Sequence, residues 1–83
     1  MSKYQKLLAM ILSGTADANV PFADLCHLLR LLGFVMRTKG SHHLFRKAGV
    51  EEKVNLQKDG NKAKPYQVRQ VRAVIIRYRL GGE

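Results

Sequence analysis

The sequence of 83 residues predicts one α+β domain, in which a three-stranded antiparallel sheet packs on helices across a single face. Apolar residues recur every three or four positions toward both ends of the chain, but every second position in its middle. Turns that contain glycine separate the middle runs from one another. A chain of this length buries roughly 60–65% of its unfolded surface, which is enough for one thin two-layer core.

The N-terminal part of the chain predicts two helices. Residues 3–13 carry apolar side chains at helical spacing, and the following stretch to residue 19 is rich in small and capping residues, so it reads as a loop. A second helix is expected to start around Val20-Pro21, because proline is tolerated in a first helical turn. This helix is expected to stop at Gly33, where glycine suits a left-handed cap.

The middle of the chain predicts three short strands, over residues 34–39, 42–47 and 52–57. Tight turns at Lys39-Gly40-Ser41 and at Ala48-Gly49 separate them. The third run is followed by a further turn signal over residues 58–61. Three such runs in sequence indicate an antiparallel meander.

A last helix is expected over residues 66–80, directly after Pro65. Val68, Val71 and Ile75 lie on one of its faces. The predicted order is therefore helix, helix, three strands, helix. One sheet with every helix on the same face is the simplest packing of these elements.

Positive charge is the strongest compositional signal. Fifteen Lys and Arg stand against six Asp and Glu, which gives a net charge of +9. So much like charge on a small protein favours a polyanionic partner. Nucleic acid is the leading class, an acidic protein the second and an anionic membrane surface a distant third. Residues 60–82 contain no carboxylate and carry six basic residues: Lys62, Lys64, Arg69, Arg72, Arg77 and Arg79.

Composition also excludes several classes of protein. No apolar run approaches the roughly 20 residues of a membrane-spanning helix, and no secretory signal is recognised. Cys26 is the only cysteine, which excludes a disulfide-stapled domain. It lies in an apolar stretch, where an inert thiol is expected. We therefore expect a cytoplasmic protein.

The adjacent residues His42 and His43 are the most informative pair in the sequence. In a strand they point to opposite faces of the sheet. An imidazole accepts and donates protons near neutral pH, and RNA supplies its own 2′-hydroxyl nucleophile. From the residues alone, however, a structural role is the commoner one. A metal site lacks ligands, because His27 is distant in sequence and there is one cysteine.

Strand alternation allows the two faces to be assigned. Phe45 is the larger apolar residue of its strand, so we place it inward, together with His43. His42 then faces outward, with Arg46 beside it to hold a phosphate oxygen. Leu44 lies exposed on the same outer face, which suggests a surface that a protein partner covers.

Three segments resemble the HicA toxins of bacterial HicA–HicB toxin–antitoxin modules, which cut messenger RNA. The resemblance runs from about Asp24 to Leu80. It implies a core over residues 20–80 with a double-stranded-RNA-binding-like fold, to which residues 1–19 add an N-terminal helix and loop. It also implies an endoribonuclease without metal or cofactor, silenced by a HicB-type antitoxin. The segments are Leu31-Leu32-Gly33-Phe34, Lys39-Gly40-Ser41-His42-His43-Leu44-Phe45 and Lys64-Pro65-Tyr66-Gln67-Val68-Arg69-Gln70-Val71-Arg72.

The resemblance assigns the catalytic general acid or base to His42, in the Gly-x-His element of the family. The chain departs from many members where Lys47-Ala48-Gly49 replaces a His-Pro pair, so a second catalytic histidine is not supported. The alternative function is a non-catalytic RNA-binding module of the same fold. DNA binding through the N-terminal helices is less favoured, because the second helix carries Arg30 as its one strong base. Charge and proximity indicate the substrate-binding residues Lys39, Gly40, Ser41, His43, Arg46, Lys64, Arg69 and Arg72.

Overall fold

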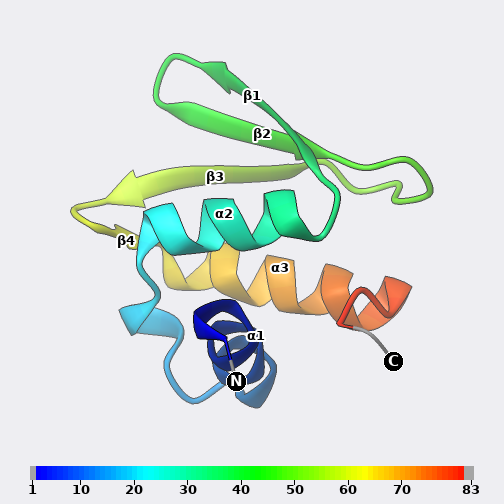
Figure 1. Cartoon of the computed structure of the whole chain (residues 1–83). Coiled ribbons are helices and arrows are strands. Elements are labelled where there is room, and N and C mark those ends of the chain that lie inside the picture. The colour runs from blue at the N-terminus through cyan, green and yellow to red at the C-terminus, as the bar shows by residue number, and fades with distance from the viewer. Residues whose placement is uncertain (1, 82–83) are drawn as a thin grey trace.

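A computed structural model, which describes residues 2–81, confirms a small α+β protein with an antiparallel sheet (Figure 1). The elements are α1 (Lys3–Ser13), a 3₁₀ turn (Asp17–Asn19), α2 (Phe22–Leu31), β1 (Val35–Lys39), β2 (His42–Arg46), β3 (Val54–Asp59), β4 (Lys62–Ala63) and α3 (Pro65–Tyr78). The predicted helices agree with these bounds to within a few residues, as do the first three strands.

The elements stack in three layers. Strands run in the order β1-β2-β3-β4, each antiparallel to its neighbour. Helices α2 and α3 lie side by side beneath the sheet, and α1 packs against both of them on the side away from the strands (Figure 1). One face of the sheet is therefore covered by helices, and the other is free of them.

The sheet has four strands, so the prediction of three was wrong. Strand β3 continues to Asp59, and the turn at Gly60 returns the chain as β4. A strand of two residues is too short to show an alternating pattern in a sequence. Contacts distant in sequence hold it instead, because the backbone N–H of Ala63 donates to the carbonyl of Val20 over 3.0 Å. The side chain of Ala63 is buried.

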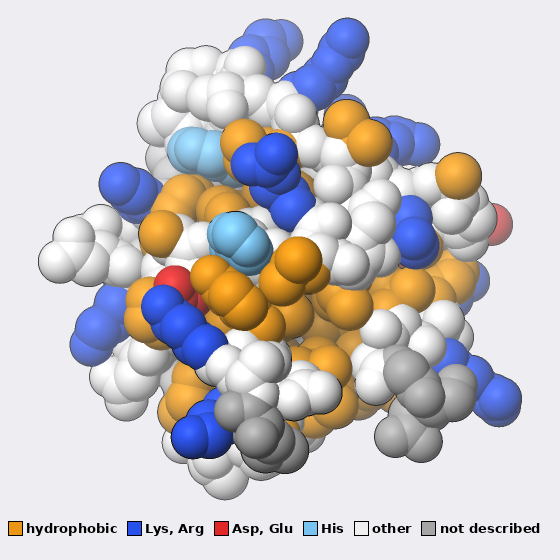
Figure 2. Space-filling model, viewed as in Figure 1, with side chains coloured by type: hydrophobic (Ala, Val, Ile, Leu, Met, Phe, Trp, Pro, Cys, Tyr) orange, Lys and Arg blue, Asp and Glu red, His pale blue; other side chains and the backbone are white. Residues whose placement is uncertain are grey.

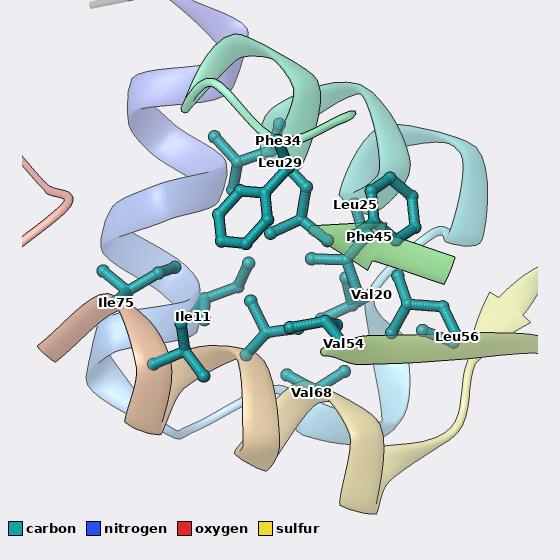
Figure 3. Packing of buried hydrophobic residues seen from close by; sticks show 14 of the residues in the cluster. Ile11, Val20, Leu25, Leu29, Phe34, Phe45, Val54, Leu56, Val68 and Ile75 are labelled. Atoms are coloured by element: carbon teal, nitrogen blue, oxygen red, sulfur yellow. The ribbon is translucent and has the colours of Figure 1, made fainter. Parts of the chain in front are cut away.

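The core lies between the sheet and the layer of α2 and α3. Phe45 is 0% exposed, which confirms that its face of β2 points inward. Figure 3 shows the apolar side chains of the strands directed toward those of the helices. Labelled members of this cluster are Phe45, Val54 and Leu56 from the sheet, and Leu25, Leu29, Val68 and Ile75 from the helices.

Local signals explain where the helices begin and end. Ser2 and Gln5 form a reciprocal capping box at the start of α1, with bonds of 3.2 Å and 2.9 Å. Pro65 occupies the first turn of α3, where its missing N–H costs nothing. After α2 the chain turns at Gly33 with φ of +100°, a conformation that favours glycine. None of the helices in residues 2–81 is both long and apolar enough to cross a membrane.

Candidate functional site

The sheet surface that no helix covers carries the predicted histidine. Register identifies its outward side chains, because directly paired residues share a face. Lys39 pairs with His42, and Leu44 pairs with both Arg37 and Asn55. We call this surface the open face and define it by the outward residues that pair between β1 and β2 and between β2 and β3: Val35, Arg37, Lys39, His42, Leu44, Arg46, Asn55 and Gln57.

A two-residue turn places His42 at the start of β2. Gly40 has φ of +60° at the first turn position and Ser41 follows, a pattern typical of a type II′ hairpin turn. This turn fixes the register in which Lys39 lies across from His42. The imidazole of His42 is exposed, as strand alternation predicted.

Asn55 orients the His42 ring. The Oδ1 atom of Asn55 lies 3.1 Å from Nδ1 of His42. A carbonyl oxygen only accepts hydrogen bonds, so this contact is a hydrogen bond in the tautomer that carries its proton on Nδ1. In the neutral ring Nε2 then keeps its lone pair and is free to accept a proton. Sequence reasoning missed Asn55 as a site residue, although the alternation of β3 puts it on the outer face.

A hydrogen-bonded chain lies beside His42. Nε2 of Gln57 donates to Oγ of Ser41 over 3.3 Å, and Nζ of Lys64 donates to Oε1 of Gln57 over 3.2 Å. The backbone N–H of Gln57 also donates to the buried side chain of Gln67. The structure thus connects Ser41 and Lys64, two predicted site residues, through Gln57. The turn before His42 is tied in this way to the start of α3.

An apolar hollow of about 300 Å³ occupies another part of the open face. Leu44 is half-buried and forms its floor with the exposed Val35. Three cations surround this floor, and no carboxylate lines it. Arg46 was expected here, whereas Arg37 of β1 and Lys53, which precedes β3, were missed, because strand pairing brings them to Leu44. The arrangement suits a ligand that combines negative charge with an apolar group.

Two predicted basic residues lie elsewhere. Both terminal nitrogens of Arg72 bond the carboxylate of Asp17, over 2.8 Å and 3.0 Å, and Arg72 also donates to the carbonyl of Ile11. The Arg72 guanidinium holds the pKa of the Asp17 carboxyl below its ordinary value, and the charge of Arg69 contributes to the same shift. Arg72 therefore ties α3 to α1 and to the 3₁₀ turn, while Arg69 is exposed on α3 and acts on the charge of Asp17. They do not join His42 on the open face.

The second histidine of the pair lies on the helical side of the sheet. The ring of His43 meets that of Phe22 edge to face, with centroids 4.9 Å apart. Its Nδ1 is buried and makes no hydrogen bond to the described residues. His43 therefore faces inward, as strand alternation predicted, and the structure does not bring this predicted substrate-binding residue together with His42.

The cysteine and the metal-ligating residues add no further reactive group. Burial raises the pKa of the Cys26 thiol to about 11, so it stays protonated at neutral pH. Within residues 2–81, no group of three or more His, Cys, Asp or Glu side chains gathers as a metal site would require. What the open face offers chemically is one imidazole among cations.

Comparison of the chain with models of protein families, with curated proteins and with solved structures gave no match.

Proposed function

We propose that this chain is an endoribonuclease toxin of the HicA type, which cleaves messenger RNA in the cytoplasm without a metal ion. The observation that carries the proposal is the exposed imidazole of His42, oriented by Asn55 on a sheet face rich in cations. The elements from α2 to α3 would then correspond to a double-stranded-RNA-binding-like core, with α1 as an addition and β4 as a short fourth strand.

His42 would act on the ribose next to the scissile phosphate. Nε2 takes the proton of the 2′-hydroxyl, and the 2′-oxygen attacks phosphorus. The bond from phosphorus to the 5′-oxygen breaks, and that oxygen takes a proton from water. The hydroxide left behind takes the proton from Nε2, which restores the neutral imidazole. The products are a 2′,3′-cyclic phosphate and a 5′-hydroxyl. Lys39, the cross-strand partner of His42, stabilises the added negative charge in the transition state.

The remainder of the open face would hold the RNA chain. Arg37 and Arg46 contact phosphates on either side of the hollow, and a base or ribose rests on Leu44. Ser41 and Lys64 contact the backbone near the turn, where Gln57 keeps them in place. None of these contacts reads a base edge in a fixed way, so a relaxed sequence preference is expected.

The same surface suits a protein inhibitor. A HicB-type antitoxin that covers the open face would place acidic groups on Arg37, Arg46 and Lys53 and an apolar side chain in the hollow. Blocking His42 in this way silences cleavage without changing the fold.

A non-catalytic RNA-binding module is the alternative, and one observation favours it. His42 is the one imidazole among the outward residues of β1, β2 and β3, and within residues 2–81 its side chain bonds the Asn55 amide and not a carboxylate that could act as a second acid or base. Such a module would use the same cations but leave the RNA intact.

Incubation of end-labelled RNA with the purified protein in EDTA separates the two functions. We expect cleavage that His42→Ala and His42→Gln abolish while RNA binding persists. Asn61→Ala is the control, because it removes an exposed polar side chain from the turn between β3 and β4, outside the residues that define the open face. Intact RNA with the unaltered protein, or cleavage that survives both His42 variants, would contradict the proposal.

A further inference from the structure

A second groove lies on the helical side of the sheet, between α2 and the inner surfaces of β1, β2 and β3. Its volume is about 270 Å³. The view in Figure 2 shows hydrophobic side chains on this side of the molecule with histidine and basic side chains around them. Its lining includes Phe22, His27 and Arg30 from α2, and Met36, His43 and Lys58 from the strands.

The floor of the groove is apolar and partly aromatic. Phe22 is 3% exposed and supplies one edge of this floor, against which His43 packs edge to face. Met36 and His43 are half-buried and supply the rest. Thioether and aromatic groups of this kind favour a flat, polarizable ligand, such as a nucleobase.

Two cations stand at the groove without acidic partners. Arg30 and Lys58 are exposed, and neither forms an ion pair within residues 2–81. Nζ of Lys58 lies 5.8 Å from the centroid of the Phe22 ring, directly above the floor. The acid of α2, Asp24, is bound to Lys3 over 3.1 Å and does not line the groove. The groove therefore suits a ligand that carries a negative charge next to an apolar group.

The added helix α1 fixes one wall of the groove. The ring of His27 stacks on that of Tyr4, with centroids 4.7 Å apart and planes 11° from parallel. This contact restricts the rotation of His27 and holds its ring upright on α2. A preformed wall lowers the entropy that a ligand would otherwise lose on binding. The wall gives α1 a role beyond the stability of the helical layer.

We propose that this groove binds a single nucleoside monophosphate, with the base on Phe22 and Met36 and the phosphate on Arg30 and Lys58. The volume lies just below the usual range for small-molecule pockets, which suits one nucleotide rather than two. The ligand is either a free nucleotide or one unit of an RNA chain. Because the groove and His42 lie on opposite faces of the sheet, binding here does not depend on catalysis.

Amide chemical shifts of the labelled protein, recorded during titration with AMP, test the proposal. We expect the shifts to centre on α2 and on the inner positions of β1 and β3. Ala23→Glu adds a carboxylate at an exposed lining position of α2 and should weaken binding by more than about tenfold. Ala23→Gln, its uncharged match, should change binding by less than about twofold. Lys58→Gln should weaken it about three- to fivefold.

Three further titrations identify the ligand. If a short RNA oligonucleotide shifts the groove amides and AMP does not, and if Ala23→Glu removes these shifts, the ligand is a nucleotide within an RNA chain. Shifts of equal size with inorganic phosphate or an acidic peptide would overturn the proposal, because they would show no recognition of the base. The absence of shifts in the groove amides with both AMP and RNA would overturn the proposal as well. His42→Ala should bind like the unaltered protein, which separates failure of this site from failure of the proposed cleavage.

Discussion

His42 and Asn55 are joined side chain to side chain across β2 and β3, with 3.1 Å between Nδ1 and Oδ1. The two residues are diagonal neighbours, since His42 pairs directly with Gln57 and Asn55 pairs with Leu44. A diagonal contact within one sheet face holds the imidazole over the surface. Asn55 is therefore a positioning residue for the reaction that we propose.

Replacing Asn55 should slow cleavage without abolishing it. Asn55→Ala frees the His42 ring to rotate, so we expect the single-turnover rate to fall about tenfold. Asn55→Asp keeps an acceptor and adds a negative charge that favours the protonated ring. The acid limb of its rate–pH profile should therefore move up by about one pH unit. Rates of RNA cleavage across the range in which histidine titrates measure both effects.

A matched variant controls for the loss of an amide side chain. Asn61→Ala removes an exposed asparagine from the turn between β3 and β4, outside the residues that define the open face, and should leave the profile unchanged. If Asn55→Asp and Asn55→Ala gave the same profile as the unaltered protein, Asn55 would have no part in positioning His42.

Two neighbouring residues of β2 should respond to truncation very differently. Phe45 is fully buried, so Phe45→Ala leaves a cavity and should lower the free energy of unfolding by about 3–5 kcal/mol. Leu44 points to the open face and is half-buried, so Leu44→Ala should lower it by less than about 1 kcal/mol. Urea denaturation of both variants measures the difference. Equal losses would mean that the faces of β2 are not those described.

The contrast between Leu44 and Phe45 shows how much of the fold strand alternation predicts. Alternation and residue size together place Phe45 inward and His42 outward, because one face of a sheet has to be buried. Helix periodicity and capping residues likewise locate all three helices. The short strand β4 could not be predicted in this way, because it has no local sequence pattern. It is held by the hydrogen bond from Ala63 to Val20, which is distant in sequence.

The sequence predicts the site residues whose placement depends on a single strand. It does not predict those whose placement depends on how two strands pair. The turn and the alternation of β2 are enough to place His42. Asn55 and Gln57 become site residues through the register of β2 and β3, which local sequence does not specify. The placement of Arg72 away from the open face could not be predicted either, because it also depends on a contact distant in sequence. Its partner Asp17 lies far away in sequence, so local sequence does not show that Arg72 belongs to a half-buried ion pair.

Asp17 should make the stability of the protein depend on pH in the acid range. Its pKa in the folded state is lowered from 3.8, mainly by the hydrogen bond from Arg72. The ion pair therefore stabilises the fold fully above that value, and the contribution is lost as the pH falls through the lower folded-state pKa. Asp17→Asn should be less stable than the unaltered protein at neutral pH and should lose less stability on acidification. Urea midpoints at several pH values measure this.

Two other acids serve as comparisons for Asp17. Asp59 is exposed and forms no ion pair within residues 2–81, so Asp59→Asn should leave the acid limb unchanged. Glu52, whose pKa is lowered mainly by the hydrogen bond from Tyr78, should keep part of the pH dependence in Asp17→Asn. An identical acid limb in Asp17→Asn and in the unaltered protein would rule out the pair with Arg72 as a source of stability.

The salt dependence of RNA binding distinguishes the cations of the open face from those that serve the fold. Each phosphate contact to a single strand contributes about 0.7 to the slope of log affinity against log salt. Arg37→Gln and Arg46→Gln should each reduce the slope by about that amount, because both side chains line the hollow beside Leu44. Arg79→Gln removes an exposed charge beyond the end of α3 and should leave the slope unchanged, although the net charge falls equally. Three equal reductions would show that RNA responds to the total charge of the protein and not to the open face.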